Sequence, residues 1–169
     1  MANEIYLVRG TTVAWLNSGG DEELDLGDGV IGLSGAVGVG SYHDFGAAPQ
    51  PDEYEIVVDI DGFATAPVVG ESVDVYIAES ADATLWTGPE APSNTADSTG
   101  ATVRLPNLKF VGSVVVHTTT AANNLTGSFL IRSSSRYIAP VVHNNTADNL
   151  LATADAHRVN ITPVYYQVQ

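Results

Sequence analysis

The chain of 169 residues contains no cysteine and only one lysine. Without cysteine, disulfide bonds, thiolate catalysis and cysteine-ligated zinc sites are all excluded. Six basic residues stand against twenty acidic ones, and the formal net charge is −14. Binding to phosphate-rich partners requires a patch of basic side chains, so this composition argues against a nucleic-acid partner and against an anionic membrane surface.

Long apolar runs are also missing. The most apolar stretch, residues 30–39, is short and interrupted by glycine, whereas a transmembrane helix needs roughly 20 apolar residues. The opening residues 1–4 have neither the basic nor the apolar segment of a secretion signal. We therefore expect a protein that is made in the cytoplasm and is not held in a membrane.

Recognisable catalytic motifs are scarce. The four histidines do not have the spacing of zinc or cupin ligands, and residues 32–36 lack the final glycine of a nucleophile elbow. The acidic clusters at 21–28 and 59–62 lack the full spacing of a calcium loop. Twenty acids offer many carboxylate pairs for glycoside hydrolysis, but no pair stands out. We expect no enzymatic activity, no cofactor and no bound metal.

The charges that are present are sorted along the chain. Residues 1–100 hold eighteen of the twenty acids, and residues 101–169 hold five of the six bases. Two surfaces of opposite sign would let copies meet head to tail, or let one end dock on a partner of opposite charge. The alternative is that the acids lie in solvated loops and serve solubility.

Period-two alternation of apolar and polar residues dominates the sequence and predicts strands. Together with shorter apolar segments it gives about nine short strands, at residues 5–8, 13–16, 30–39, 54–60, 73–77, 108–116, 129–132, 137–142 and 158–162. Residues 148–156 predict a loop or one helical turn. The pattern indicates a single antiparallel β-sandwich domain over residues 1–169 with long loops, and its length favours a jelly roll. Pro140 and Pro163 fall inside expected strands, which we therefore expect to be edge strands or to carry bulges.

Two segments depart from this pattern. The glycine-rich run within residues 27–40 is either a bulged strand or part of an extended arm contributed by residues 1–50. Residues 80–101 form a long polar stretch that we expect to be an exposed loop. Trp86 within it either fixes the loop to the core or contacts a neighbouring molecule.

The C-terminal third carries a family resemblance. An Arg-Tyr-Ile-Ala-Pro run at 136–140 leads into Val-Val-His-Asn-Asn-Thr at 141–146, and His-Arg-Val-Asn-Ile-Thr-Pro follows at 157–163. These residues, with the opening at 2–10, resemble the head decoration (cement) proteins of tailed bacteriophages. The resemblance covers about half of the chain and carries no catalytic residues. It implies a jelly-roll protein on the outer surface of a capsid, acting as a trimer that clamps neighbouring copies of the major capsid protein.

The sequence therefore favours a non-enzymatic virion structural protein. Its expected partners are the major capsid protein and further copies of itself as a homotrimer. Its expected location is the outside of the capsid, after synthesis in the host cytoplasm. The alternative is a carbohydrate-binding jelly-roll module that uses Trp86 as a stacking platform, and a third reading is an enzyme that uses two carboxylates. The candidate interface residues are Arg9, Trp86, Arg132, Arg136 and Arg158.

Overall fold

The computed structural model describes residues 5–16, 20, 22–24, 37–46, 51–88, 92, 95–97, 105–122, 124–153 and 155–168. The glycine-rich residues 27–36, most of the acidic cluster at 21–28 and much of the 89–104 segment therefore lie outside the described residues. The elements are β1 (Ile5–Arg9), β2 (Val13–Leu16), β3 (Glu22–Glu23), β4 (Val37–Val39), β5 (His43–Asp44), β6 (Glu53–Asp61), β7 (Ser72–Ser80), β8 (Thr95–Asp97), the 3₁₀ turn η1 (Leu105–Asn107), β9 (Lys109–Val115), β10 (Asn124–Arg132), β11 (Tyr137–Asn145) and β12 (His157–Val168).

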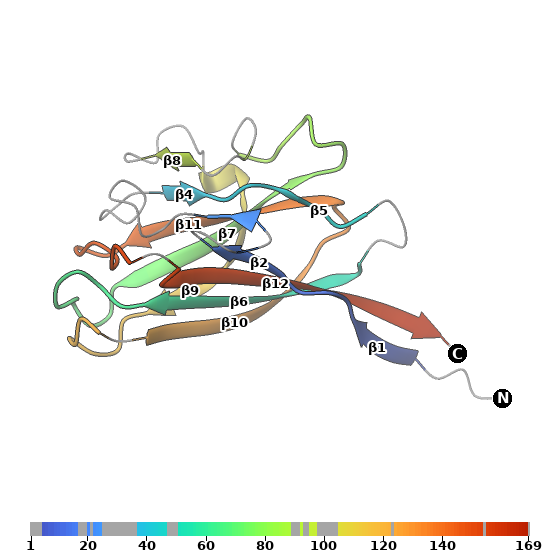
Figure 1. Ribbon diagram of the computed structural model, residues 1–169. Coiled ribbons are helices and arrows are strands. Elements are labelled where there is room, and N and C mark those ends of the chain that lie inside the picture. Colours follow the sequence, from blue (N-terminus) through green and yellow to red (C-terminus); the bar gives the residue numbers. More distant parts are fainter. Residues whose placement is uncertain are drawn as a thin grey trace.

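The strands form two packed sheets, which confirms the predicted β-sandwich (Figure 1). The first sheet has the order β10-β6-β12-β2-β3, and β1 also pairs with β12. The second sheet has the order β8-β4-β11-β7-β9, and β5 also pairs with β11. All these pairings are antiparallel except that between β2 and β3. The described strands number twelve, more than the nine expected, because several are only two or three residues long.

Strict alternation explains why the strands form a core. In β6, the side chains of Tyr54, Ile56, Val58 and Ile60 are fully buried between the sheets. The intervening residues point out of the first sheet. Trp15 of β2 is also fully buried and donates an indole N–H bond to the carbonyl of Ser41 at 2.7 Å. The alternation of Val13 and Trp15 with Ala14 and Leu16 predicts that Trp15 packs in the core, and its burial confirms this.

A second apolar cluster lies on the opposite side of the second sheet. Its buried members are Val37, Val39, Ala78, Leu108, Ala139 and Val141, and half-buried Tyr76, Trp86 and Leu105 pack against them. The second sheet is therefore buried on both sides. The first sheet has no such cluster on its outer face among the described residues, so the two sides of the sandwich differ.

The prolines correct one expectation, because β11 and β12 are central strands and not edges. Each proline instead faces a break in the strand beside it. Pro163 lies between the stretches of β12 that pair with β2 and β1, and Pro140 lies between those of β11 that pair with β4 and β5. At each break the proline carbonyl accepts an N–H bond from a glycine. Gly10 donates to Pro163 at 2.8 Å, and Gly40 donates to Pro140 at 2.9 Å. A missing donor is harmless where the neighbouring strand is interrupted.

Strand β9 corrects a second expectation. The alternation predicted that Phe110 shares the inward face of Val114, yet its side chain is exposed and Val111 packs against the core instead. The cause is a bulge: the pairing of β9 with β7 shifts by one residue between Val75 and Tyr76. A one-residue shift moves the following side chains to the other face.

The remaining expectations concern loops. Residues 148–156 form a loop without helix, apart from Ala154, which is not described, and Leu150 makes an isolated bridge to Phe63. The Asp61-Gly62 pair that follows the alternating residues 54–60 predicts a turn, and the turn is present, with Gly62 at a φ of +93°. Within the described residues, no helix has the length and hydropathy needed to cross a membrane.

Candidate binding surfaces

The outer face of the first sheet brings three of the five candidate interface residues together. Strand β6 contributes a row of acids there, and an arginine reaches one of them from each of its neighbours β10 and β12 and from β1, which pairs with β12. Arg9 of β1 lies 2.9 Å from Glu55, Arg132 of β10 lies 3.0 Å from Glu53, and Arg158 of β12 lies 2.8 Å from Asp59. Arg132 and Arg158 are directly opposite their partners in the strand register.

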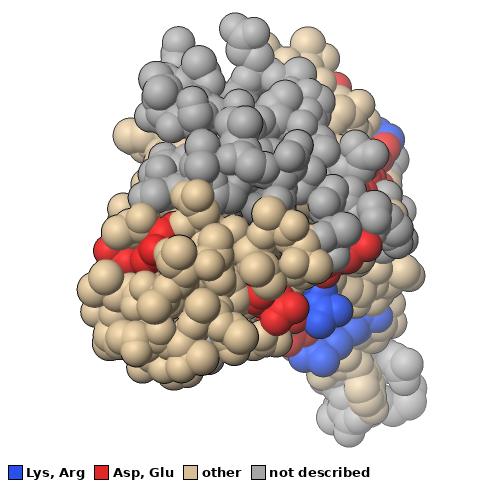
Figure 2. Space-filling model, turned by 60° about the vertical axis from the view of Figure 1, so that its left-hand side comes forward, with Lys and Arg blue, Asp and Glu red and all other residues tan. Residues whose placement is uncertain are grey.

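Ion pairs within the fold connect most of the basic side chains of residues 101–169 to acids of residues 1–100. Every described Lys or Arg side chain makes an ion pair with an acid of residues 1–100; the other two pairs are Lys109–Glu79 and Arg136–Asp44. Arg104 lies outside the described residues. Figure 2 shows the same mixture, with blue basic side chains bordered by red acidic ones. The fold therefore joins the acidic and basic parts within one chain, and the interface role of these arginines stays a prediction.

Glu53 is the most enclosed acid of this face. It is 5% exposed, accepts a hydrogen bond from the Tyr166 hydroxyl at 2.7 Å, and accepts another from the Arg132 guanidinium at 3.0 Å. These two bonds hold the pKa of Glu53 below its ordinary value, and the bond from Tyr166 has the larger effect. The same hydrogen bond raises the pKa of Tyr166. Glu53 is thus an ionised anchor between strands near neutral pH, and a general acid would need the opposite shift.

A hollow of about 390 Å³ lies over this anchor, between β1 and β10. Leu7, Leu130 and Tyr166 supply exposed apolar surface to its walls, and Glu53 and Glu55 lie on its floor. Sequence reasoning missed this hollow, because Leu7, Leu130 and Tyr166 come from strands far apart in the chain. One signal was available: four consecutive apolar residues, 5–8, break the alternation expected of a half-buried strand.

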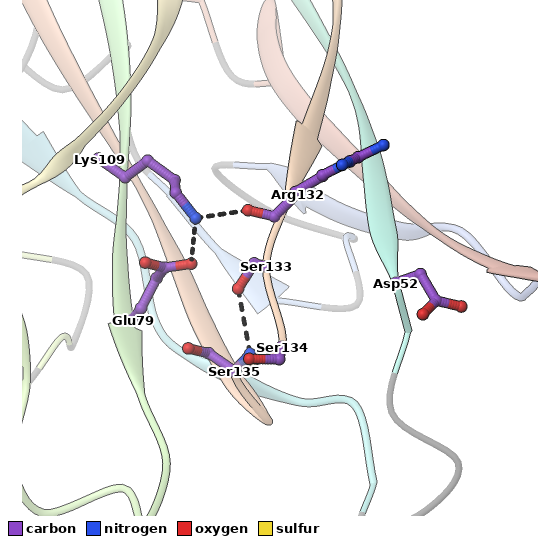
Figure 3. Close-up of a pocket in the computed structure, with 7 residues that line it drawn as sticks. All are labelled: Asp52, Glu79, Lys109, Arg132, Ser133, Ser134 and Ser135. Atoms are coloured by element: carbon purple, nitrogen blue, oxygen red, sulfur yellow. Dashed lines mark hydrogen bonds and ion pairs between the residues drawn. The ribbon is translucent and has the colours of Figure 1, made fainter.

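A second hollow, of about 370 Å³, lies at the turn between β10 and β11 (Figure 3). The Lys109 ammonium lies between Glu79, at 3.1 Å, and the carbonyl oxygen of Arg132, whereas the Arg132 guanidinium points away from them. The serine turn is closed by a bond from the Ser135 N–H to the Ser133 hydroxyl at 3.1 Å. Lys109 of β9 thereby links the second sheet to β10 of the first sheet, and its ammonium group is already paired with Glu79.

The other two candidate residues, Trp86 and Arg136, meet at an aromatic cluster on the second sheet. Tyr42 lies between Trp86 and Tyr137, with ring centroids 5.3 and 5.9 Å apart. The Arg136 guanidinium lies 4.8 Å over the Tyr137 ring and binds both carboxylate oxygens of Asp44 at 2.6 Å. This guanidinium lowers the pKa of Asp44. Trp86 is half-buried against the second apolar cluster, so it fixes its loop to the sheet.

A histidine–carboxylate contact near a serine, between His43 and Glu22, does not form a nucleophilic site. Glu22 accepts hydrogen bonds from the His43 ring at 2.7 Å and from the Ser41 hydroxyl at 2.9 Å. Serine catalysis requires the serine to donate to the histidine, and here both bind the same carboxylate. Among the described residues, no three His, Asp or Glu side chains are grouped as metal ligands. The arrangement is suited to holding β2, β3 and β5 together.

Comparisons with known proteins give no family. No family model and no curated protein matches the chain. A solved structure of the N-terminal part of endo-1,4-β-D-xylanase 10B of Clostridium thermocellum, its CBM22-1 and GH10 modules complexed with xylohexaose, is 10% identical with a TM-score of 0.34. The match covers 90% of this chain and 26% of that one, so the chain spans about a quarter of its length. A likeness of this size carries no argument about function.

Proposed function

We propose that this chain is a non-enzymatic structural protein that decorates the outer surface of a tailed-phage capsid. Its expected partner is the major capsid protein. The resemblance to decoration proteins lies in residues 136–146 and 157–163, within and beside β11 and β12, and in residues 2–10, which include β1. Strands β11 and β12 are the central strands of the two sheets and build the frame of the sandwich, whereas β1 is exposed.

The observation that carries the proposal is the exposed apolar surface concentrated at β1, on a protein whose described Lys and Arg side chains are all ion-paired. All five residues of β1 are exposed, and four of them are apolar or aromatic. Soluble proteins rarely leave such a segment uncovered unless it contacts another protein. The open outer face of the first sheet adjoins it through the hollow lined by Leu7, Leu130 and Tyr166. Together they offer a contact surface without any catalytic group.

Three of the described acids lack the pKa that a general acid needs. Hydrogen bonds lower the pKa values of Glu53, Asp44 and Asp82, and for Glu53 and Asp44 one of these bonds comes from an arginine. Two-carboxylate hydrolysis needs one acid whose pKa is raised. The strongly acidic remainder of the surface keeps a particle soluble and discourages unspecific contacts.

Particle binding tests this proposal. Virions that carry the gene are purified, stripped of this chain by mild denaturant, and mixed with the purified protein before sedimentation. We expect the chain to be present in the particles and to rebind to the stripped shells. The variant Leu130→Arg places a charge in the open face and should weaken rebinding at least tenfold, whereas Val69→Arg in the β6–β7 loop should not. Absence of the chain from the particles would refute the proposal.

The aromatic cluster supports carbohydrate binding as the second candidate function. Tyr42 is 42% exposed beside a charged Asp44–Arg136 pair, an arrangement of ring and polar groups that suits a sugar. Titration with soluble oligosaccharides while Trp fluorescence is recorded would test it. A saturable change that Tyr42→Ala abolishes would favour this function. The mutual tilt of the rings, 46° and 80°, leaves no flat platform and makes it the weaker candidate.

A further inference from the structure

Strand β1 and the end of β12 form a ribbon that projects beyond the sandwich (Figure 1). The ribbon consists of residues 5–9 paired with residues 164–168. Ile5 is 69% exposed and Leu7 is 57% exposed, although both lie in a paired strand. Two-stranded ribbons are marginally stable alone in water, and an apolar one exposes surface that further pairing would cover.

The outer edge of β1 carries backbone groups directed away from β12. Gly10 donates its N–H to the carbonyl of Pro163, across the ribbon. Antiparallel pairs alternate between bonded and non-bonded positions, so residues 8 and 6 also bond toward β12. The N–H and C=O groups of Ile5, Leu7 and Arg9 then point outward. Within the described part of the chain, no strand pairs with this edge.

Charge decides where two copies of this chain can approach each other. The net charge of −14 makes most of the surface repel a second copy. The ribbon is the exception, because Arg9 is its one charged residue and is neutralised by Glu55 at 2.9 Å. Since the ribbon projects from the body, contact through it also keeps the acidic bodies apart.

We propose that the outer edge of β1 binds the same edge of a second copy, antiparallel and around a two-fold axis at Leu7. This register pairs Leu7 with Leu7 of the second copy, and Ile5 with its Arg9. Every outward backbone group of the three residues then gains a partner, and the other face pairs Tyr6 with Val8, an aromatic and a β-branched side chain. The first sheets of both copies become one continuous sheet. An interface of identical edges is self-complementary and closed.

The expected strength follows from the size of the contact. A five-residue edge covers less than the roughly 800 Å² per partner of a standard stable interface. We therefore expect a reversible dimer that forms in the micromolar range and becomes tighter in salt, because salt screens the repulsion between acidic bodies. Head-to-tail docking of acidic on basic surfaces would weaken in salt. The proposal uses the contact surface of the proposed function, but it does not require a capsid, and it replaces the trimer implied by the resemblance with a dimer.

Site-specific crosslinking is the sharpest test, because the wild-type chain has no cysteine. At a two-fold axis, Leu7→Cys faces its own copy, and Cα atoms about 5.5 Å apart in a bonded pair suit a disulfide. We expect mild oxidation to give a disulfide dimer at least tenfold faster for Leu7→Cys than for Val68→Cys. Val68 is a matched control because it is 54% exposed and lies in the β6–β7 loop, at the opposite end of the sandwich. Equal rates would overturn the proposal.

Sedimentation velocity of the wild-type chain, at low and high salt, gives the independent readout. The wild type should approach two chain masses as concentration and salt increase. Leu7→Pro removes an outward donor and spares the bonds to β12, so it should remain monomeric with an unchanged unfolding temperature. A wild type that stays monomeric, or forms three chain masses, overturns the proposal. Monomers that still rebind capsids would leave the proposed function standing, and dimers that do not rebind would refute that function alone.

Discussion

At the scale of single residues, the structure turns sequence-distant charges into neighbours. Glu53 and Tyr166 are separated by 113 positions, yet they share a hydrogen bond of 2.7 Å because β6 and β12 are adjacent strands. Exposed ion pairs contribute at most about 1 kcal/mol each. The main structural role of Glu53 is to connect three strands, because this residue of β6 bonds side chains of β10 and β12.

The lowered pKa of Glu53 predicts how stability depends on pH. A carboxyl group with a lower pKa in the folded chain stabilises the fold above its unfolded value and loses this contribution as the pH falls through the folded value. The ordinary value here is 4.5. We expect the free energy of unfolding to be level above about pH 5.5 and to decline below about pH 4.5. Urea unfolding at a series of pH values measures this.

Two variants separate Glu53 from the other acids. Glu53→Gln should make the acid-side decline shallower, because its side chain no longer takes up a proton on unfolding. Asp61→Asn, at the exposed end of β6, serves as the control and should leave the slope as it is in the wild type. If both variants behave alike, the acid sensitivity arises elsewhere.

Ala83 has an unfavourable backbone conformation. Its φ is 60°, in the left-handed region that L-residues rarely adopt, and its carbonyl accepts the indole N–H of Trp86 at 3.2 Å. Asp82 fixes the turn by accepting the N–H groups of Thr84 at 2.8 Å and Leu85 at 3.0 Å. Residues 82–86 therefore form an ordered turn that holds Trp86 on the sheet.

Ala83→Gly should raise the free energy of unfolding by up to about 1 kcal/mol, because glycine adopts this φ without strain. Ala81→Gly provides the matched control. Ala81 has no positive φ, so glycine there only adds entropy to the unfolded chain and should destabilise it slightly. Chemical denaturation of both variants gives the comparison, and a loss of stability in Ala83→Gly would contradict the prediction.

At the scale of elements, the contact between β9 and β10 depends on small residues under one ring. The Phe129 ring lies over Gly112 of β9 and Gly127 of its own strand. A Cβ atom added at Gly112 would lie 2.2 Å from the Phe129 Cε1 atom. No van der Waals contact is that short, so either the ring or the strand must move.

Gly112→Ala should therefore lower the free energy of unfolding by about 1–3 kcal/mol. Combining it with Phe129→Leu should recover part of the loss, because the smaller side chain leaves room for the new methyl group. The double-mutant cycle, measured by urea unfolding, should give a coupling energy above about 0.5 kcal/mol. Additive losses would show that the ring does not rest on Gly112.

At the scale of the whole molecule, the acids greatly outnumber the bases. The described basic residues are already paired, so the remaining acids repel one another in the compact chain. Sodium chloride weakens both effects, but the isolated pairs contribute little. We expect the unfolding temperature to rise between low salt and about 0.5 M salt. A fall measured by calorimetry would mean that the ion pairs outweigh the repulsion.

The sequence by itself determined the class of fold. Alternation at 54–60 and 73–77 requires one apolar and one polar face, and only packed sheets bury such faces. It also identified Trp15 as a core residue and excluded thiol chemistry. The alternation was wrong at Phe110, because a bulge in pairing with β7 is a property of two strands, whereas a periodicity describes one.

Only the tertiary structure decided which surfaces are free. The sequence separates acids from bases along the chain, but the register of β6 with β10 and β12 brings them together and neutralises the arginines. Proline inside β11 and β12 predicts edge strands or bulges, yet both strands are central. This is possible because each proline faces a break in the neighbouring strand. Strand β1 is likewise exposed because it pairs with residues 164–168 of β12, which continue past Glu53, the first residue of β6. Burial, register and edges depend on contacts between distant segments, and a local pattern does not contain them.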